Sequence, residues 1–142
     1  MYPGYSRKPH YYETDQMGII HHSNYIRWFE EARVDLLEWL NLPYRTIEDA
    51  GIIIPVLAVT CTYKSMVRYG DLVKIHVFVD NYSGTRFDFR YELVNLTTNQ
   101  VATIGTSSHC FLSSERQRLV SLKKSFPEFH KTFETYVMNQ EN

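Results

Sequence analysis

The stretch SNYIRWFEEARVDLLEWL, residues 23–40, decides the fold class of this chain. Its apolar side chains recur at steps of three and four residues, which is the spacing of one face of an α-helix. They are Tyr25, Trp28, Phe29, Ala32, Leu36, Trp39 and Leu40. We therefore predict an amphipathic helix of about sixteen residues, capped by Ser23 or Asn24 and stopped by Pro43.

Downstream of this helix the period of the pattern changes to two, which is typical of half-buried strands. The strand-like segments are residues 52–64, 73–80, 87–93 and 101–112. Turn-forming residues at 82–85 and 95–99 separate the last three of them. Four strands in a row predict an antiparallel sheet in which neighbours in sequence pair with each other.

The remaining segments complete an α+β layout. Residues 5–12 indicate a short strand that leads into a loop, residues 44–50 a short helix, and the C-terminal segment an amphipathic helix entered through Ser125 and Pro127. A curved antiparallel sheet wrapped around the long helix would bury the apolar faces of both. We assign six rings to that core: Trp28, Phe29, Trp39, Phe87, Phe89 and Tyr91.

The composition fits one globular domain, residues 1–142. The net charge of −1 and the lack of a basic run argue against a nucleic-acid partner. Cys61 and Cys110 lie in apolar strand-like segments, so we expect buried free thiols rather than a disulfide. No segment reads as a signal peptide or a membrane span, so we expect no stable membrane insertion and a cytoplasmic location.

Reactive side chains concentrate in YYETDQMGIIHH, residues 11–22, just before the long helix. The first amides of a helix are unpaired and carry partial positive charge, so they stabilise a carboxylate or a developing oxyanion. Asp15 and the amides near His22 and Ser23 are therefore candidates to face one reacting carbonyl. The alternative is structural: Asp15 accepts hydrogen bonds from loop amides in an Asx-type turn.

We predict neither a metal nor a cofactor. His21 and His22 are adjacent, and with His10, His109 and Glu30 or Glu31 they show no spacing typical of a metal site. The chain also lacks a Walker loop, a dinucleotide-binding glycine pattern and a serine-nucleophile elbow. The sequence therefore lacks the motifs that are typical of enzymes for phosphoryl transfer and hydride transfer.

The pattern Tyr11-x-x-x-Asp15-x-x-Gly18-x-x-x-His22-x-x-Tyr25, followed by Trp28-Phe29-Glu30-x-Ala32-Arg33, resembles a known family. It is similar to the opening of the 4-hydroxybenzoyl-CoA thioesterase family of hotdog-fold acyl-CoA thioesterases, in its YbgC/FadM-like branch. The resemblance continues through Pro55 and Tyr69-Gly70-Asp71 to Phe111, about residues 5–115. The hotdog fold that it implies agrees with the layout derived from periodicity.

The resemblance implies an activity and roles for three residues. Asp15 matches the family's catalytic carboxylate, acting as nucleophile or general base. His22 matches the position whose backbone amide polarises the thioester carbonyl, and Tyr11 matches an aromatic hydroxyl near the carboxylate. The expected reaction is hydrolysis of an acyl-CoA to a free acid and CoA.

Further residues are candidates for holding the substrate: Gly18, Ser23, Tyr25, Tyr63, Arg68 and Arg86. Some family members hold the CoA phosphates with a basic cluster before the third strand, where this chain has only Arg86. The phosphates could instead meet Lys64, Arg68, Arg116 or Arg118. We place Tyr12 near the acyl site together with Tyr11, Tyr25 and Tyr63.

Two other functions fit the same residues. One is a non-catalytic hotdog module that binds acyl-CoA or lipid, and the other is a hydratase or dehydratase that uses Asp15 and His22 as an acid/base pair. The resemblance also implies a homodimer or homotetramer with the active site at the subunit interface, and edge strands that are long and apolar favour such pairing.

Overall fold

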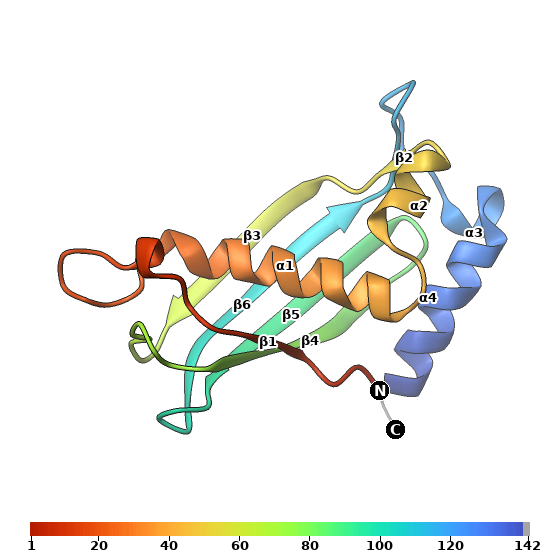
Figure 1. The fold of residues 1–142 in the computed structure, drawn as a ribbon. Coiled ribbons are helices and arrows are strands. Elements are labelled where there is room, and N and C mark those ends of the chain that lie inside the picture. The colour runs from red at the N-terminus through yellow and green to blue at the C-terminus, as the bar shows by residue number, and fades with distance from the viewer. Residues whose placement is uncertain (141–142) are drawn as a thin grey trace.

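The computed structural model describes residues 1–140; Glu141 and Asn142, the last two residues of the expected domain, lie outside the described part. A five-stranded antiparallel sheet of order β1-β4-β5-β6-β3 curves around helix α1, Ser23–Trp39 (Figure 1). Its strands are β1 Tyr5–Arg7, β3 Val56–Tyr63, β4 Val73–Tyr82, β5 Arg86–Asn95 and β6 Gln100–Cys110. The predicted α+β layout is confirmed.

The other helices gather at the end of the molecule remote from the start of α1 (Figure 1). They are α2 Tyr44–Asp49, α3 Leu122–Ser125 and α4 Pro127–Gln140. The predicted short helix and the predicted terminal helix are both present, and α3 was not foreseen. No helix within residues 1–140 is long and apolar enough to cross a membrane.

The core lies between α1 and the concave face of the sheet. Strands β4 and β5 alternate as predicted, with one face buried and the other partly exposed. Phe29 of α1 stacks on Tyr91 of β5, with ring centroids 4.6 Å apart and planes 8° from parallel. Gly105 of β6 lies under the Phe29 ring, and a Cβ there would stand 2.6 Å from it. The close approach of helix and sheet therefore depends on the missing side chain.

The predicted pairing of sequence neighbours is correct for β4, β5 and β6 but wrong for β3. Strand β3 pairs with β6, from Val56 opposite His109 to Tyr63 opposite Thr103, and does not pair with β4. Short turns join β4 to β5 and β5 to β6, so these strands pair locally. The longer connection after Tyr63 lets the chain cross the sheet to β4, which lies next to the β1 edge, leaving β3 beside β6.

Two predicted strands are shorter than expected. The segment 52–64 divides at Pro55, because proline donates no ladder hydrogen bond. Its first part, β2 Ile52–Ile53, pairs with β7, Leu112–Ser113, outside the main sheet. At the N-terminus only Tyr5–Arg7 is strand, and Tyr11–Glu13 forms a 3-10 turn, η1.

Two expectations about α1 are wrong. Its N-cap residue is His22, with no side-chain cap, because the Asn24 side chain instead donates to the backbone oxygens of Glu13 and His21. Trp39 is 46% exposed rather than buried in the core. The last turn of the helix packs against the N-terminal segment and α4 instead of the sheet, so Trp39 only touches the rings of Tyr2 and Tyr136 edge-on.

The two edges of the sheet differ. The β4 edge is covered by β1 and, further along, by the Gln140 side chain, which bonds both the N–H and the C=O of Val79 at 2.8 Å. The β3 edge has no neighbouring strand within residues 1–140. Four of its apolar side chains are 39–51% exposed: Val56, Leu57, Val59 and Tyr63.

Candidate active site

The loop between η1 and α1 folds back on itself and holds Asp15 beside the start of the helix. The Asp15 N–H donates to the Ile19 oxygen at 2.9 Å, and the Ile20 N–H donates to the Val67 oxygen at 2.8 Å. Gly18 turns the loop with φ +77°, a left-handed conformation that glycine adopts without strain. Local backbone bonding therefore fixes where the Asp15 carboxylate lies.

Asp15 is half-buried, and its carboxylate makes one hydrogen bond within residues 1–140. Oδ1 accepts the Met17 N–H at 2.8 Å, which is the Asx-type turn considered as the structural alternative. One carboxylate oxygen is engaged in this way, and the other has no hydrogen-bond partner in the described chain. The structural role is therefore present and leaves one oxygen available for chemistry.

Asp15 lines a cavity of about 310 Å³. Four of the predicted site residues meet there: Asp15, His22, Tyr25 and Tyr63. Lys64, considered for the CoA phosphates, also lines the cavity. Sequence reasoning missed the rest of the lining, which consists of Met17, Ile19, Ile20, Ser65 and Met66. The cavity is mainly apolar and aromatic, with a single carboxylate, and this is the usual composition of a small-molecule site.

Two phenols form part of the cavity wall. The rings of Tyr25 and Tyr63 lie 5.4 Å apart, and the Tyr63 hydroxyl donates to the His22 oxygen at 3.2 Å. Burial raises the pKa of Tyr25 to about 12, and burial together with Cys61 raises the pKa of Tyr63 to about 12. Both hydroxyls therefore stay protonated at neutral pH and can donate hydrogen bonds.

The start of α1 has one unpaired backbone donor at a residue that lines this cavity. The Ser23 and Asn24 amides are already bonded to His21, through its Nδ1 and its backbone oxygen. The His22 N–H makes no hydrogen bond to any residue of the described chain. An unpaired N–H at the positive end of a helix dipole is suited to an oxyanion.

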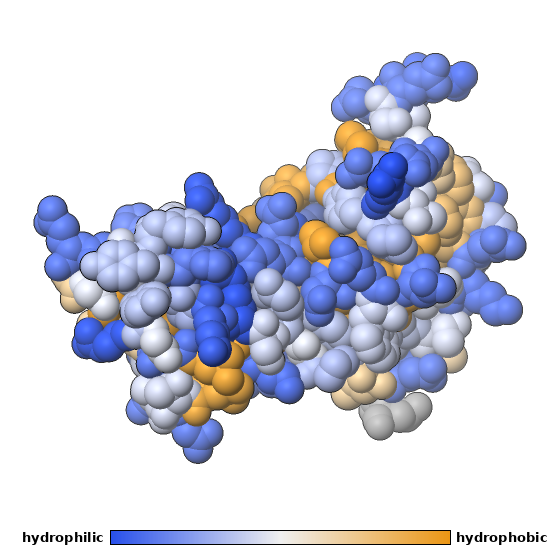
Figure 2. All heavy atoms as spheres, viewed as in Figure 1, coloured by the Kyte–Doolittle hydropathy of each residue, from blue (hydrophilic) through white to orange (hydrophobic). Residues whose placement is uncertain are grey.

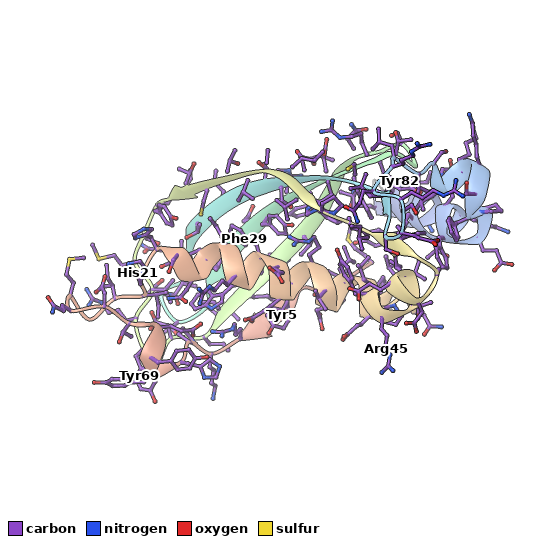
Figure 3. All side chains as sticks on the ribbon, turned by 90° about the horizontal axis from the view of Figure 1, so that it is seen from above. Tyr5, His21, Phe29, Arg45, Tyr69 and Tyr82 are labelled. Atoms are coloured by element: carbon purple, nitrogen blue, oxygen red, sulfur yellow. The ribbon has the colours of Figure 1, made fainter. Side chains whose placement is uncertain are left out.

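A second hollow, of about 630 Å³, lies on the other side of Asp15. Tyr11, Tyr12 and Ser23 line it together with Asp15, so these three candidates lie beside the carboxylate but do not line the smaller cavity. Tyr11 and Tyr12 are 75% and 80% exposed. The Tyr11 ring meets Tyr69 edge-on, and Figure 3 shows Tyr69 and His21 at the same end of the molecule.

The structure separates the two candidate arginines. Arg68 pairs with Ile19 in an isolated β-bridge, so it borders the Asp15 loop. Arg86 begins β5, seven residues before Leu93, which is level with Tyr63 in the sheet register. At about 3.3 Å per residue it lies roughly 23 Å along the sheet from the cavity. Figure 3 shows the neighbouring Tyr82 at the opposite end of the molecule from His21.

The candidate metal ligands and the cysteines are also placed. His21 and His22 stack on each other, with ring centroids 4.2 Å apart, while His109 is buried under the sheet face. Residues 1–140 contain no group of three or more side chains placed to hold a metal ion. Both cysteines are free as predicted, but only Cys110 is buried and Cys61 is half-buried.

Glu13 is an important residue that sequence reasoning missed. It is only 4% exposed and forms an ion pair with Arg7, 2.7 Å between Nη1 and Oε1. Nothing in the polar segment around it signals burial. The only available signal is distant in sequence: an arginine six residues earlier and a tryptophan fifteen residues later.

A family model described as the thioesterase-like superfamily matches residues 9–131. The chain belongs to this superfamily. The Bacillus subtilis protein YneP is 32% identical over 124 residues, which cover 87% of this chain and 89% of YneP. A DHNA-CoA thioesterase from Staphylococcus aureus is 33% identical and superimposes with a TM-score of 0.89, covering 96% of this chain and 92% of that one.

A third relative is the 1,4-dihydroxy-2-naphthoyl-CoA hydrolase of Thermosynechococcus vestitus. It is 27% identical over 116 residues, 81% of this chain and 80% of the relative. These findings confirm three expectations: the thioesterase resemblance, the α+β hotdog fold and the activity class of a thioester hydrolase.

Proposed function

We propose that this superfamily member hydrolyses an acyl-CoA thioester to a free carboxylic acid and CoA, with Asp15 as the reacting carboxylate. The observation that carries the proposal is that Asp15 and His22 lie at the same cavity. Both line one cavity at the start of α1, where the His22 N–H is unpaired. The relatives named for DHNA-CoA and for 1,4-dihydroxy-2-naphthoyl-CoA support CoA as the thiol.

In the proposed reaction the His22 N–H donates to the thioester oxygen and stabilises the negative charge that develops there. Asp15 either attacks the carbonyl carbon, giving a mixed anhydride that water then cleaves, or removes a proton from an attacking water. Both routes break the C–S bond. CoA leaves as a thiolate that takes up a proton, and the acyl group leaves as the acid.

The direct experiment compares the wild type with Asp15→Asn by following release of free thiol from acyl-CoA. Loss of the carboxylate is expected to lower kcat by about 10²–10⁴-fold, the usual contribution of such a group. Gln16→Ala, a change in the same exposed loop, is the matched control and should retain activity. A variant Asp15→Asn that turns over like the wild type would remove Asp15 from the mechanism.

We also propose that the acyl group is aromatic. Tyr25 and Tyr63 provide flat walls, and Met17 and Met66 provide adaptable thioether contacts in the same cavity. The relative from Thermosynechococcus vestitus is named for a 1,4-dihydroxy-2-naphthoyl substrate. In a panel of naphthoyl-, benzoyl-, hexanoyl- and palmitoyl-CoA, we expect kcat/KM to be highest for an aromatic member.

The same panel, with crotonyl-CoA added, distinguishes the two alternative functions. A binding module would hold acyl-CoA stoichiometrically without releasing thiol. A hydratase would convert crotonyl-CoA to its hydroxyacyl product with the thioester intact. Thiol release that depends on Asp15 excludes both.

For the whole molecule we propose one thioesterase domain that works in the cytoplasm as a homodimer, or as a homotetramer made of two such dimers. The uncovered β3 edge supports self-association, because unpaired strand edges with exposed apolar side chains pair readily with another chain. The outward side of α1 is mostly hydrophilic (Figure 2), and Glu30, Glu31, Asp35 and Glu38 line a hollow along it. This acidic side is the poorer surface for self-association.

A further inference from the structure

A buried carboxylate that the proposed reaction does not use lies next to the candidate site. Each carboxylate oxygen of Glu13 accepts two hydrogen bonds. Oε1 accepts from Arg7 Nη1 and the His10 N–H, each at 2.7 Å. Oε2 accepts from Arg7 Nη2 at 3.0 Å and from Trp28 Nε1 at 2.8 Å. We call Arg7, His10, Glu13 and Trp28 the Glu13 network.

The Glu13 network joins three separate parts of the chain. Arg7 belongs to β1, His10 precedes η1, and Trp28 is a fully buried residue of α1. The Arg7 guanidinium also lies over the Trp28 ring, 4.7 Å from its centroid. The N-terminal segment is therefore fixed against the first half of α1 by one carboxylate.

The charge of Glu13 is stabilised in place. Burial alone would raise the pKa of this carboxyl, but the hydrogen bonds from Arg7, His10 and Trp28 outweigh burial and hold the pKa below its ordinary value. An ionised, fully bonded carboxylate in a buried position has little freedom to move, because every displacement breaks a charge-assisted hydrogen bond.

The backbone oxygen of Glu13 also binds the C-terminal end of the loop that carries Asp15. The Glu13 oxygen accepts the His21 N–H at 2.9 Å and the buried Asn24 side chain at 3.0 Å. Asp15 follows Glu13 by two residues, and the unpaired N–H of His22 follows that of His21 by one. Glu13 thus sets the position of both reacting groups at once.

We propose that Glu13 is a positioning residue for thioester hydrolysis, acting through the loop that carries Asp15 and His22. The inference rests on the proposed function. Misplacement of a reacting group by about 1 Å can cost about 100-fold in rate. Loss of the Glu13 network should therefore lower kcat about 10- to 100-fold. KM should stay within about threefold, since Tyr25, Tyr63 and Met66 of the cavity wall lie outside the loop and stay in place.

The test compares Glu13→Gln with Glu31→Gln. Glu31 is the matched control because it bonds the same arginine, at 2.7 Å from Arg7 Nε, and the Tyr5 hydroxyl at 2.9 Å, but makes no bond to the loop. Figure 3 shows Tyr5 beside α1, away from His21. Both variants remove a carboxylate from Arg7, and only Glu13→Gln should lower kcat.

A second variant covers the case in which Glu13→Gln fails to fold. Trp28→Phe keeps a buried aromatic ring at this position and removes the Nε1 donor to Glu13 together with the five-membered ring of the indole, so its kcat should fall about 3- to 10-fold at unchanged KM. If the two residues act through one bond, the double variant should be no slower than Glu13→Gln alone.

The readouts are kcat, KM, the melting temperature and the affinity for a non-hydrolysable thioether analogue of the acyl-CoA. We expect the analogue to bind all variants equally. A wild-type kcat in both Glu13→Gln and Trp28→Phe, or an equal loss of kcat in Glu31→Gln, would overturn the inference. Failure of the proposed function is distinguishable, because then either Asp15→Asn would retain activity or the wild type itself would release no thiol, whatever Glu13 does.

Discussion

The backbone amide of His22 and its side chain make separable predictions. His22 has φ −57°, which proline can adopt, and its N–H makes no hydrogen bond in the described chain. His22→Pro therefore removes the proposed oxyanion donor at little cost in folding, whereas His22→Ala keeps the donor and removes the imidazole. We expect kcat to fall about 10²–10³-fold in His22→Pro and less than about tenfold in His22→Ala.

The measurement is kcat for thiol release, with circular dichroism and the melting temperature showing that each variant is folded. If the two variants were equally slow, the side chain rather than the amide would be the active group. That outcome would favour the acid/base pairing of Asp15 with His22 over an oxyanion site.

A pH-dependent stability is expected from His109, a fully buried imidazole on β6 that contacts the Ser107 hydroxyl at 2.8 Å. Burial, reinforced by the charge of Arg33, lowers the pKa of His109 to about 4. An unfolded chain would bind this proton near pH 6.5. The stability from keeping His109 neutral is therefore complete above about pH 6.5 and is lost as the pH falls toward 4.

The loss over that range should be about 2–3 kcal/mol in the free energy of unfolding. It is measured by urea unfolding at pH 7, 6, 5 and 4. His109→Gln cannot gain a proton, so its stability should fall less over the same range. His10→Gln, which removes an imidazole at the surface, is the control; the same flattening in that variant would contradict the assignment.

At the scale of single residues, sequence reasoning found the polar and aromatic groups of the cavity and missed its aliphatic lining and the residues that support it. Asp15, His22 and Tyr25 stand out because a carboxylate, a helix start and an aromatic ring occur in a recognisable order. Glu13 lies in the same polar segment, and its burial depends on Arg7 and Trp28, which only the folded chain brings near. Arg86 shows the converse: its residue type suits CoA phosphates, but the register places it far from the cavity of the same chain.

Among the elements, the contact between α1 and β6 is the most sensitive to a small change. A Cβ on Gly105 would lie 2.6 Å from the Phe29 ring and 2.7 Å from the Thr60 oxygen, and the latter belongs to rigid backbone. Gly105→Ala should therefore lower the free energy of unfolding by about 2–3 kcal/mol, the range for overpacking a core.

Urea unfolding measures this loss, and Thr106→Ala, on the opposite sheet face, should cost less than about 1 kcal/mol. Adding Phe29→Leu to Gly105→Ala should recover part of the stability, since it removes one of the two clashes. If Gly105→Ala were as stable as the wild type, the missing side chain of Gly105 would not be needed for the close approach of α1 to β6.

Elements with strong periodicity were the ones that the sequence predicted well. Helix α1 and strands β4 and β5 each bury one face, and their side chains reveal it. The β3 segment was misjudged in two respects, its length and its partner. Both depend on features that the pattern of apolar residues does not contain: Pro55 divides the segment, and the connection after Tyr63 is long enough to cross the sheet to β4.

Considered as a whole, the molecule has one protected edge and one open edge, and the periodicity of individual strands could not reveal this difference. The protection of β4 comes from residues at the two ends of the chain, β1 and Gln140. Only the assembled sheet shows that β3 remains without a neighbour. The expectation of an oligomer came from the resemblance and from the long, apolar edge strands, and the open β3 edge supports it.

The last prediction concerns this edge. We expect the wild type to have a mass in solution of two or four times 16.8 kDa, and Val59→Lys to shift it toward the monomer. Val59 is 39% exposed in the middle of β3, and a buried lysine without a partner would oppose pairing. Light scattering coupled to size exclusion measures the mass. Leu119→Lys, at a 71% exposed position outside the sheet, is the control and should not change the mass. A monomeric wild type, or an unchanged mass in Val59→Lys, would exclude pairing through β3.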